Sequence, residues 1–318
     1  MVKVLITGGP AQEQLEELGQ HYPGVTFVSP TSTSEEVREV ADADAMIGWP
    51  TSEHLAAARK LRWVHVGSAG IDLISRVPEL IRSDIVLTNG RGSFGGPIAD
   101  HCFALILAFT RQLREFTEDQ QAKVWGGRAR APQMRELSDA TLGIVGLGNI
   151  GGEIARRGAG FRMNIVAVDL NPDARAPGVE KAWGLDRLDE LMKVSDYLAV
   201  SAPRTPETIG LIDAGRLALM KPSAFLVVVS RGRIVDEEAL IAALQEGRLA
   251  GAGLDVTATE PLPADSPLWE LPNVILTPHI SGAAPQTRER GRQLLIENLR
   301  RFVAGDTLLN VCDKEAGF

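Results

Sequence analysis

Three glycines followed by an acid form the most informative chemical pattern in this sequence. The stretch LGIVGLGNIGGEIARRGAGFRMNIVAVD carries Gly146, Gly148 and Gly151 directly after an apolar run. It ends on Asp169. In a strand–turn–helix unit such glycines permit a tight turn, a close approach of the backbone to a pyrophosphate and close packing of the helix on the strand. The helix N-terminus offers N–H groups to the phosphates, so the pattern predicts a dinucleotide-binding turn.

The acid at the end of the next strand indicates which dinucleotide binds. The Asp169 carboxylate can accept hydrogen bonds from ribose hydroxyls, and it repels the 2′-phosphate of NADP. The nearest arginine after it, Arg175, is six positions further on. We therefore expect NAD to be favoured over NADP.

Strand–helix alternation has to position this turn, and it occurs twice in the chain. From residue 141 onwards six apolar runs are typical of strands: TLGIVG, NIVAVD, YLAVSA, AFLVVVS, GAGLDV and NVILTP. The first ninety residues alternate in the same way, with KVLIT, VTFV, DAMIG, LRWVHVG and DIVLTN as strands. A helix is expected over SEEVREVA, with Ser34 as its N-cap. Alternation of this kind predicts two parallel sheets with helices on both faces.

An apolar helix and a polar loop separate the two sets of strands. The run GGPIADHCFALILAFTRQL, with Pro97 in its first turn, predicts a nearly all-apolar helix. We expect a helix this apolar to be buried between two bodies, and it has more apolar surface than a monomer tolerates. The segment KVWGGRARAPQMRELSDA after it is rich in glycine and polar residues, which is typical of a loop.

The last helix determines the expected domain organisation. The stretch PQTRERGRQLLIENLRRFVAG has an amphipathic pattern, and its inward positions are Leu294, Leu295, Asn298, Leu299, Phe302 and Val303. No strand of the second set follows this helix, so we expect it to return to the first body. The expected domains are residues 1–96 with 285–318, and residues 97–284 inserted between them.

Composition and charge exclude several classes of protein. The 318 residues carry a formal net charge of −8 without an extended Lys/Arg run, whereas nucleic-acid binders show a basic face. The two cysteines, Cys102 and Cys312, form no CxxC pair and have no histidine at metal-ligand spacing. The longest apolar stretch, CFALILAF, is far shorter than the ~20 residues that cross a bilayer. We expect a cytoplasmic protein without a metal and without nucleic-acid or membrane partners.

Over nearly its whole length the chain resembles the D-isomer-specific 2-hydroxyacid dehydrogenases. The resemblance is carried by the glycine stretch and by PRTPETIGLI, SRGRIVDEEALIAAL and GAGLDVTATEPLPADSPLWELPNVILTPHISG. In that family a flavodoxin-like substrate domain is split around an inserted Rossmann NAD-binding domain. The resemblance therefore implies an α/β fold with two doubly wound parallel-sheet domains, and it accounts for a glycine loop near the middle of the chain.

The same resemblance implies that Arg231, Glu260 and His279 form the catalytic set. Reduction of a 2-oxo acid to a D-2-hydroxy acid needs a hydride at C2 and a proton at the carbonyl oxygen. His279 is the implied proton donor, because an imidazole exchanges protons near neutral pH. Glu260 can hold the imidazole by one nitrogen. Arg231 is the implied carboxylate clamp, because its guanidinium is planar and permanently charged.

Each of these residues alone also has an ordinary structural interpretation. His279 can be a loop histidine with satisfied hydrogen bonds, Arg231 a salt-bridge arginine and Glu260 a turn acid. Their occurrence inside three matching motifs favours the catalytic interpretation.

The resemblance also assigns binding residues. Predicted cofactor contacts are Gly146, Gly148, Asn149, Ile150, Gly151, Asp169, Pro203, Thr208, Val229, Arg231, Asp255, His279 and Gly282. Predicted substrate contacts are Trp49, Ser68, Ala69, Gly70 and Arg231. Trp49 can equally be an interdomain packing residue. Departures from the family pattern are Ser201 in place of histidine, Arg204 in place of leucine, Val228 in place of asparagine and Asp100 in place of glutamate.

Other functions within the same superfamily stay open at this point. One is an NAD(H)-sensing binding protein of the corepressor type. Another is an enzyme that oxidises a different donor, such as phosphite or phosphoglycerate, whereas Glu260 argues against formate because formate-specific relatives have an amide there. In relatives the apolar helix lies at a two-fold interface, so we expect a homodimer.

Overall fold

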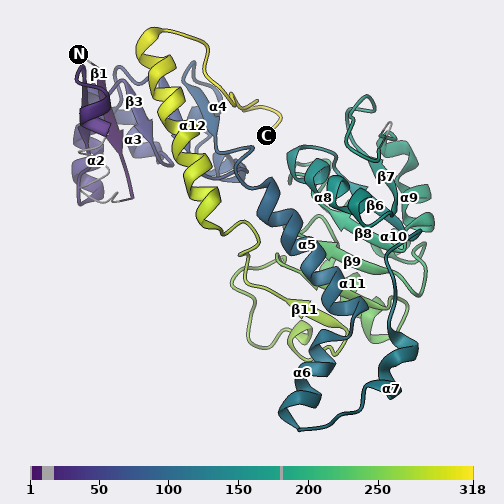
Figure 1. Ribbon diagram of the computed structural model, residues 1–318. Helices are drawn as coiled ribbons and strands as arrows, with labels where there is room; N and C mark the ends of the chain where they lie inside the picture. The colour runs from purple at the N-terminus through teal and green to yellow at the C-terminus, as the bar shows by residue number, and fades with distance from the viewer. Residues whose placement is uncertain (1, 9–17, 180–181, 318) are drawn as a thin grey trace. The chain divides into compact units, whose positions relative to one another are not determined.

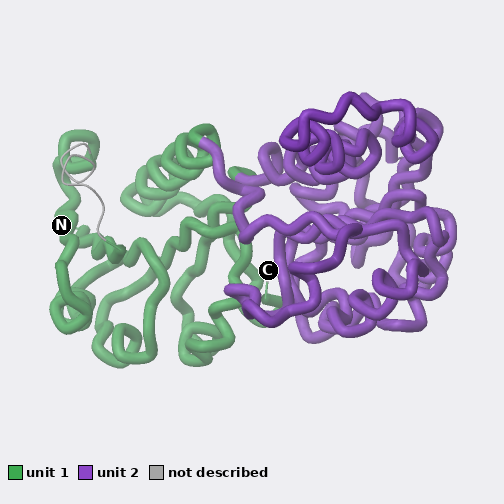
Figure 2. The backbone as a smooth tube through the Cα atoms, turned by 90° about the horizontal axis from the view of Figure 1, so that it is seen from below, with its two compact units in different colours: residues 1–93, 285–318 green, residues 94–284 purple. Residues whose placement is uncertain are grey.

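The structure is a computed structural model that describes residues 2–8, 18–179 and 182–317. The chain forms two compact units, Met1–Ser93 with Pro285–Phe318 and Phe94–Ala284 (Figure 2). The first boundary, expected after residue 96, falls after Ser93. Within the described ranges, no helix has the length and apolar character needed to span a membrane.

The first unit contains a five-stranded parallel sheet in the order β2-β1-β3-β4-β5. Its strands are β1 (Val2–Ile6), β2 (Val25–Val28), β3 (Ala45–Ile47), β4 (Trp63–Val66) and β5 (Val86–Asn89). Its helices are α2 (Thr33–Glu39), α3 (Ser52–Ala57), α4 (Pro78–Ile81) and α12 (Pro285–Ala304). This is the flavodoxin-like doubly wound order, in which the direction of strand addition reverses between β1 and β3.

The second unit contains a six-stranded parallel sheet in the order β11-β10-β9-β8-β6-β7. Its strands are β6 (Thr141–Val145), β7 (Asn164–Val168), β8 (Tyr197–Val200), β9 (Phe225–Val228), β10 (Gly251–Leu254) and β11 (Val274–Leu276). Its helices are α5 (Gly95–Thr110), α6 (Leu113–Gln121), α7 (Gly127–Arg130), α8 (Asn149–Gly160), α9 (Leu188–Val194), α10 (Ala214–Leu217) and α11 (Glu237–Gln245). A parallel bridge between Val168 and Trp183 extends the sheet beyond β7 and completes a Rossmann-type order.

The apolar helix α5 packs within its own unit, whereas we expected it to be buried between two bodies and to leave apolar surface for a partner. It packs against α8, β9 and β10, and Cys102 and Ile106 on it are completely buried. None of the large exposed hydrophobic side chains among the described residues lies on α5. The apolar sequence of α5 follows from this packing, because the helix contacts both the sheet and α8.

Of two other local expectations, one was wrong and one was incomplete. The N-cap of α2 is Ser32, whose side chain accepts from the N–H of Glu35, so Ser34 lies inside the helix. The segment expected to be a loop contains α7. Its Arg130 donates two hydrogen bonds to the carboxylate of Asp119 on α6. Short helical turns therefore interrupt a segment whose other residues have no regular secondary structure.

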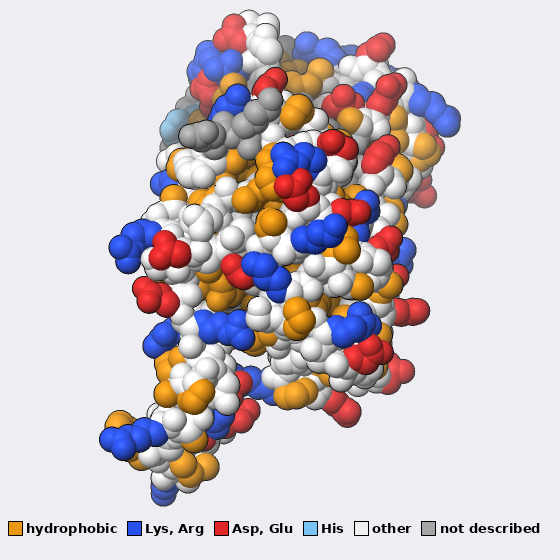
Figure 3. Space-filling model, turned by 90° about the vertical axis from the view of Figure 1, so that its right-hand side faces the viewer, with side chains coloured by type: hydrophobic (Ala, Val, Ile, Leu, Met, Phe, Trp, Pro, Cys, Tyr) orange, Lys and Arg blue, Asp and Glu red, His pale blue; other side chains and the backbone are white. Residues whose placement is uncertain are grey.

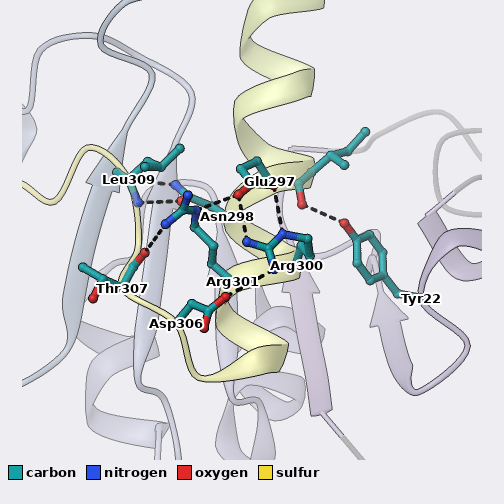
Figure 4. A network of polar contacts seen from close by, with 9 residues as sticks. Tyr22, Glu297, Asn298, Arg300, Arg301, Asp306, Thr307 and Leu309 are labelled. Carbon is teal, nitrogen blue, oxygen red and sulfur yellow. Dashed lines mark hydrogen bonds and ion pairs between the residues drawn. The ribbon is translucent and has the colours of Figure 1, made fainter.

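The helix α12 belongs to the first unit and covers one face of its sheet. Leu299 is completely buried there, and Phe302 packs on Trp63 with 5.1 Å between ring centroids. Val303, expected to face inward, is 46% exposed. Figure 4 shows how polar contacts fix this helix: the amide of Asn298 pairs with the backbone of Leu309, and Glu297 accepts from two arginines.

Candidate functional site

The residues predicted to bind a cofactor lie where the parallel strands of the second unit end. The turn containing Gly146, Gly148, Asn149, Ile150 and Gly151 follows β6, Asp169 follows β7, Pro203 and Thr208 follow β8, Val229 and Arg231 follow β9, Asp255 follows β10, and His279 and Gly282 follow β11. Carboxyl ends of parallel strands meet at one edge of a sheet, and the strand order reverses there between β6 and β8. The fold therefore gathers these residues at the edge where such sheets bind ligands.

The glycine turn has the geometry that a pyrophosphate requires. Gly146 has a backbone φ of +91°, and a Cβ on it would lie 2.7 Å from the Cα of Ala202. A Cβ on Gly151 would collide with the carbonyl oxygen of Gly146, so α8 can pack closely only with glycine there. Gly148 borders open space and caps α8 without a side-chain bond, which leaves the first N–H groups of α8 available to a phosphate.

Asp169 is oriented by backbone groups. One of its oxygens accepts from the N–H of Leu147 at 2.6 Å and the other from the N–H of Asn171 at 2.8 Å. A carboxylate has about four acceptor positions, so two remain for ribose hydroxyls. The hydroxyl of Ser201, a departure from the family pattern, donates to the carbonyl of Gly146 at 2.7 Å and so supports the same turn.

His279 and Glu260 form a hydrogen-bonded pair in the second unit. The distance between His279 Nδ1 and Glu260 Oε2 is 2.8 Å, and the other Glu260 oxygen accepts from the N–H of Thr257 at 3.2 Å. The two side chains are 46% and 38% exposed, so a small molecule can reach them. Because Nδ1 is engaged, Nε2 is the nitrogen left to exchange a proton with a ligand.

The backbone of His279 is held in an unfavourable conformation. Its φ is +52°, in the left-handed region, which costs a non-glycine residue on the order of 1–3 kcal/mol. Its N–H donates to the carbonyl of Asp255 at 2.8 Å. The buried Asp255 carboxylate accepts from the N–H groups of Ile280 and Ser281, both at 3.0 Å, and from the hydroxyl of Thr277 at 2.7 Å. Asp255 is therefore the anchor of the loop that carries His279.

The surroundings of Asp255 keep its carboxylate ionised. Burial favours the neutral acid, but hydrogen bonds from Ser281, Thr277 and the loop backbone outweigh it and lower the pKa of Asp255 below the ordinary value. The contact that we predicted between Asp255 and the cofactor stays a prediction.

An apolar pocket of about 620 Å³ lies beside the His279–Glu260 pair. Its apolar lining consists of Pro261, Leu262, Trp269, Leu276 and Pro278. The His279–Glu260 pair therefore has solvent on one side and the apolar lining of the pocket on the other.

Arg231 follows β9, and its guanidinium donates to the carbonyl of Ser230 at 2.7 Å. The hydroxyl of Ser230 is buried and makes no hydrogen bond to any residue that the structure describes. A serine after an apolar strand is too common a pattern to identify this hydroxyl from sequence. An unpartnered buried hydroxyl at this sheet edge is compatible with a polar ligand.

The predicted substrate residues lie at the carboxyl ends of strands in the first unit. Trp49 follows β3 and packs, half-buried, on the core of that unit. Ser68, Ala69 and Gly70 follow β4, where the Ser68 hydroxyl donates to the Gly70 carbonyl at 2.8 Å and the Asn89 amide donates to the Ala69 carbonyl at 2.6 Å. In the described part of the chain the N–H groups of Ala69 and Gly70 donate to no other group, so both are available to an anion.

The described residues include no cluster of three or more His, Cys, Asp or Glu side chains that could hold a metal ion.

Known proteins resemble both the sequence and the structure. Residues 103–281 match the family model described as D-isomer specific 2-hydroxyacid dehydrogenase, NAD binding domain. A glyoxylate reductase of Korarchaeum cryptofilum is 36% identical over 324 residues, which cover 98% of this chain and 96% of that protein.

Two solved structures extend the resemblance to the fold. A D-isomer specific 2-hydroxyacid dehydrogenase family protein from Aeromonas salmonicida has a TM-score of 0.82 and 31% identity, covering 99% of this chain and 100% of the other. An NADPH-dependent glyoxylate/hydroxypyruvate reductase from Sinorhizobium meliloti, in complex with NADP and sulfate, has a TM-score of 0.84 and 25% identity, covering both chains completely.

Proposed function

Because the chain belongs to the D-isomer specific 2-hydroxyacid dehydrogenase family, we propose that it reduces a small 2-oxo acid, such as glyoxylate or hydroxypyruvate, to the D-2-hydroxy acid with NADH. It is an oxidoreductase of the CH–OH group that uses a nicotinamide dinucleotide. The observation that carries the proposal is the 2.8 Å contact between His279 and Glu260 at the sheet edge that also carries the glycine turn.

The chain's own groups have distinct roles in this proposal. The dinucleotide, when bound, supplies the hydride for C2 of the substrate. His279 gives the proton from Nε2 to the carbonyl oxygen, while Glu260 keeps the imidazole oriented and favours its protonated form. Arg231 binds the substrate carboxylate. The N–H groups of Ala69 and Gly70 are proposed to donate further hydrogen bonds to a carboxylate.

We assign the two units to different tasks. The unit Phe94–Ala284 is the proposed dinucleotide-binding domain, supported by its glycine turn and by the match over residues 103–281. The unit formed by Met1–Ser93 and Pro285–Phe318 is the proposed substrate domain. Both cysteines are unpaired and buried, which fits a reducing compartment, so we propose a cytoplasmic location.

We also propose that the protein is a homodimer, but the supporting surface differs from the expected one. The helices α6 and α7 form an arm that projects from the second unit (Figure 1), and hydrophobic side chains gather on it (Figure 3). Trp125 in this arm is fully exposed, and Leu113 and Val124 are more than half exposed. Exposed apolar side chains gathered in one segment are typical of a protein–protein contact.

A substrate screen tests the proposed function. Glyoxylate, hydroxypyruvate, pyruvate and phenylpyruvate are offered with NADH, and phosphoglycerate and phosphite with NAD, while the nicotinamide absorbance is followed. We expect turnover of at least one 2-oxo acid with a D-configured product, and His279→Ala should lower kcat about 10²–10⁴-fold without loss of NADH binding. Binding of NADH without any turnover would instead favour a sensor of the corepressor type. Turnover of phosphite or phosphoglycerate alone would favour the other donor.

A further inference from the structure

We propose that His101 is a positioning residue for the reaction, acting on the loop of His279 through Thr277 and Asp255. His101 lies on α5, far in sequence from the loop and outside the predicted site residues. Its Nε2 lies 2.9 Å from the hydroxyl oxygen of Thr277. The inference rests on the proposed role of His279 as proton donor.

The direction of the hydrogen bonds follows from the chemistry of the groups. Thr277 donates its only hydroxyl proton to Asp255 Oδ1 at 2.7 Å, because an ionised carboxylate can only accept. The Thr277 oxygen must therefore accept from His101, which carries a proton on Nε2. The same nitrogen lies 3.8 Å from Asp255 Oδ1, so its N–H dipole or charge also stabilises the carboxylate directly.

This relay joins the catalytic loop to a rigid helix. Asp255 is 1% exposed and binds the backbone of Ile280 and Ser281, on the C-terminal side of His279. Without the N–H of His101, the Thr277 hydroxyl loses the donor that orients it, and one bond of Asp255 to the loop loosens. The imidazole of His279 then samples positions from which proton transfer is slow.

A purely structural role for His101 is a poor alternative. Its side chain is 22% exposed, whereas neighbours on the same helix, including Cys102, Leu105 and Ile106, are buried and attach α5 to the sheet and α8. Loss of its ring should therefore leave the fold and the unfolding temperature nearly unchanged, while altering the loop.

Four variants separate the relay from general damage. His101→Leu removes the donor at similar volume, and His101→Gln keeps an N–H near the position of Nε2. Thr277→Val removes the hydroxyl, and the fourth variant combines His101→Leu with Thr277→Val.

The expected effects on kcat differ between these variants. We expect His101→Leu to lower kcat about ten-fold with little change in KM for the oxo acid, and His101→Gln to keep most of the parent's kcat. The double variant should be no slower than Thr277→Val, because both changes break one relay. Cys102→Ala, which changes α5 packing alone, should keep kcat within about two-fold.

Amide hydrogen exchange supplies a measurement that needs no activity. A peptide covering residues 277–284 should exchange faster in His101→Leu than in the parent, and at the parent's rate in His101→Gln. If the parent turns over no oxo acid but exchange changes as described, the proposed function fails and the relay stands. If the parent is active while kcat and exchange are unaffected by His101→Leu, or if the two losses multiply in the double variant, the relay is wrong.

Discussion

The imidazole of His279 is held from two directions, by Glu260 at Nδ1 and by Asp255 through the backbone. Glu260 is partly exposed and places a negative charge beside the ring, whereas Asp255 is buried and holds the backbone of the loop in place. The two acids therefore differ in what their loss should change: the protonation of the ring in one case and its placement in the other. Asp169 performs a third task, because it fixes the glycine turn and faces the proposed ribose site.

Substitution of Glu260 by glutamine should shift the pH dependence of reduction. Removal of the negative charge next to Nδ1 disfavours the protonated imidazole, so oxo-acid reduction should decline at a lower pH than in the parent. A pH–rate profile of both proteins measures this, with Glu270→Gln, an exposed acid elsewhere in the same unit, as control. An unchanged basic limb would mean that Glu260 does not tune His279.

Substitution of Asp169 by alanine should narrow the preference for NADH over NADPH. The parent should use NADH with the higher kcat/KM, because the carboxylate repels the 2′-phosphate of NADPH. Asp173→Ala, a change in a nearby exposed acid, is the matched control and should keep the preference. Equal kcat/KM for both cofactors in the parent would refute this interpretation of Asp169.

At the scale of elements, strands β4 and β5 share a buried polar contact that makes the first unit sensitive to acid. The hydroxyl oxygen of Thr88 lies 2.8 Å from the indole nitrogen of Trp63 and 2.9 Å from Nδ1 of His65. Burial lowers the pKa of His65 from 6.5 to about 4, because the charged ring is poorly solvated there. The folded unit therefore holds this histidine neutral.

Stability should fall as the pH decreases from 6.5 to about 4. In this window the unfolded chain binds a proton at His65 and the folded chain does not, so acid favours unfolding, by about 3 kcal/mol at the end of the window. Chemical unfolding across the window checks this, with His65→Gln as comparison because glutamine does not titrate. If the parent and His65→Gln lose the same stability over this range, the buried histidine is not the cause.

Element types were predictable here, whereas their partners were not. Each apolar run ending in a small or polar residue, such as YLAVSA, became a strand, because parallel strands are buried on both faces. The glycine turn could be located because backbone geometry admits only glycine at Gly146 and Gly151, and Asp169 because it ends the next strand. The burial of α5 depends on groups distant in sequence, and the pairing of Arg130 with Asp119 joins two separate helices. Thr277 and His101 gave no local signal, since only folding brings them to Asp255.

At the scale of the whole molecule, the projecting arm is the surface that we propose to contact a second copy of the chain. The arm of α6 and α7 is stabilised internally by the Arg130–Asp119 pair but leaves Trp125 in solvent. Exposure of this apolar side chain to water is unfavourable, and a second copy can remove that cost by covering it.

The parent should sediment as a dimer at micromolar concentration, and Trp125→Asp should shift it toward monomer, because a charge cannot be buried in an apolar contact without a partner. Val303→Asp, a change at an exposed apolar position on α12, is the control and should leave the dimer intact. A parent that sediments as a monomer would contradict the dimer.

The discontinuity of the first unit has a consequence for protein synthesis. Its sheet is made at the start of translation, but α12, which covers Trp63 with Leu299 and Phe302, follows roughly 190 residues later, a delay of about 10–40 s at ordinary elongation rates. During that interval the apolar face around Trp63 meets water or chaperones in place of its own helix. The first unit to leave the ribosome is therefore the last to finish folding, and a stalled or truncated nascent chain leaves this apolar face open to aggregation.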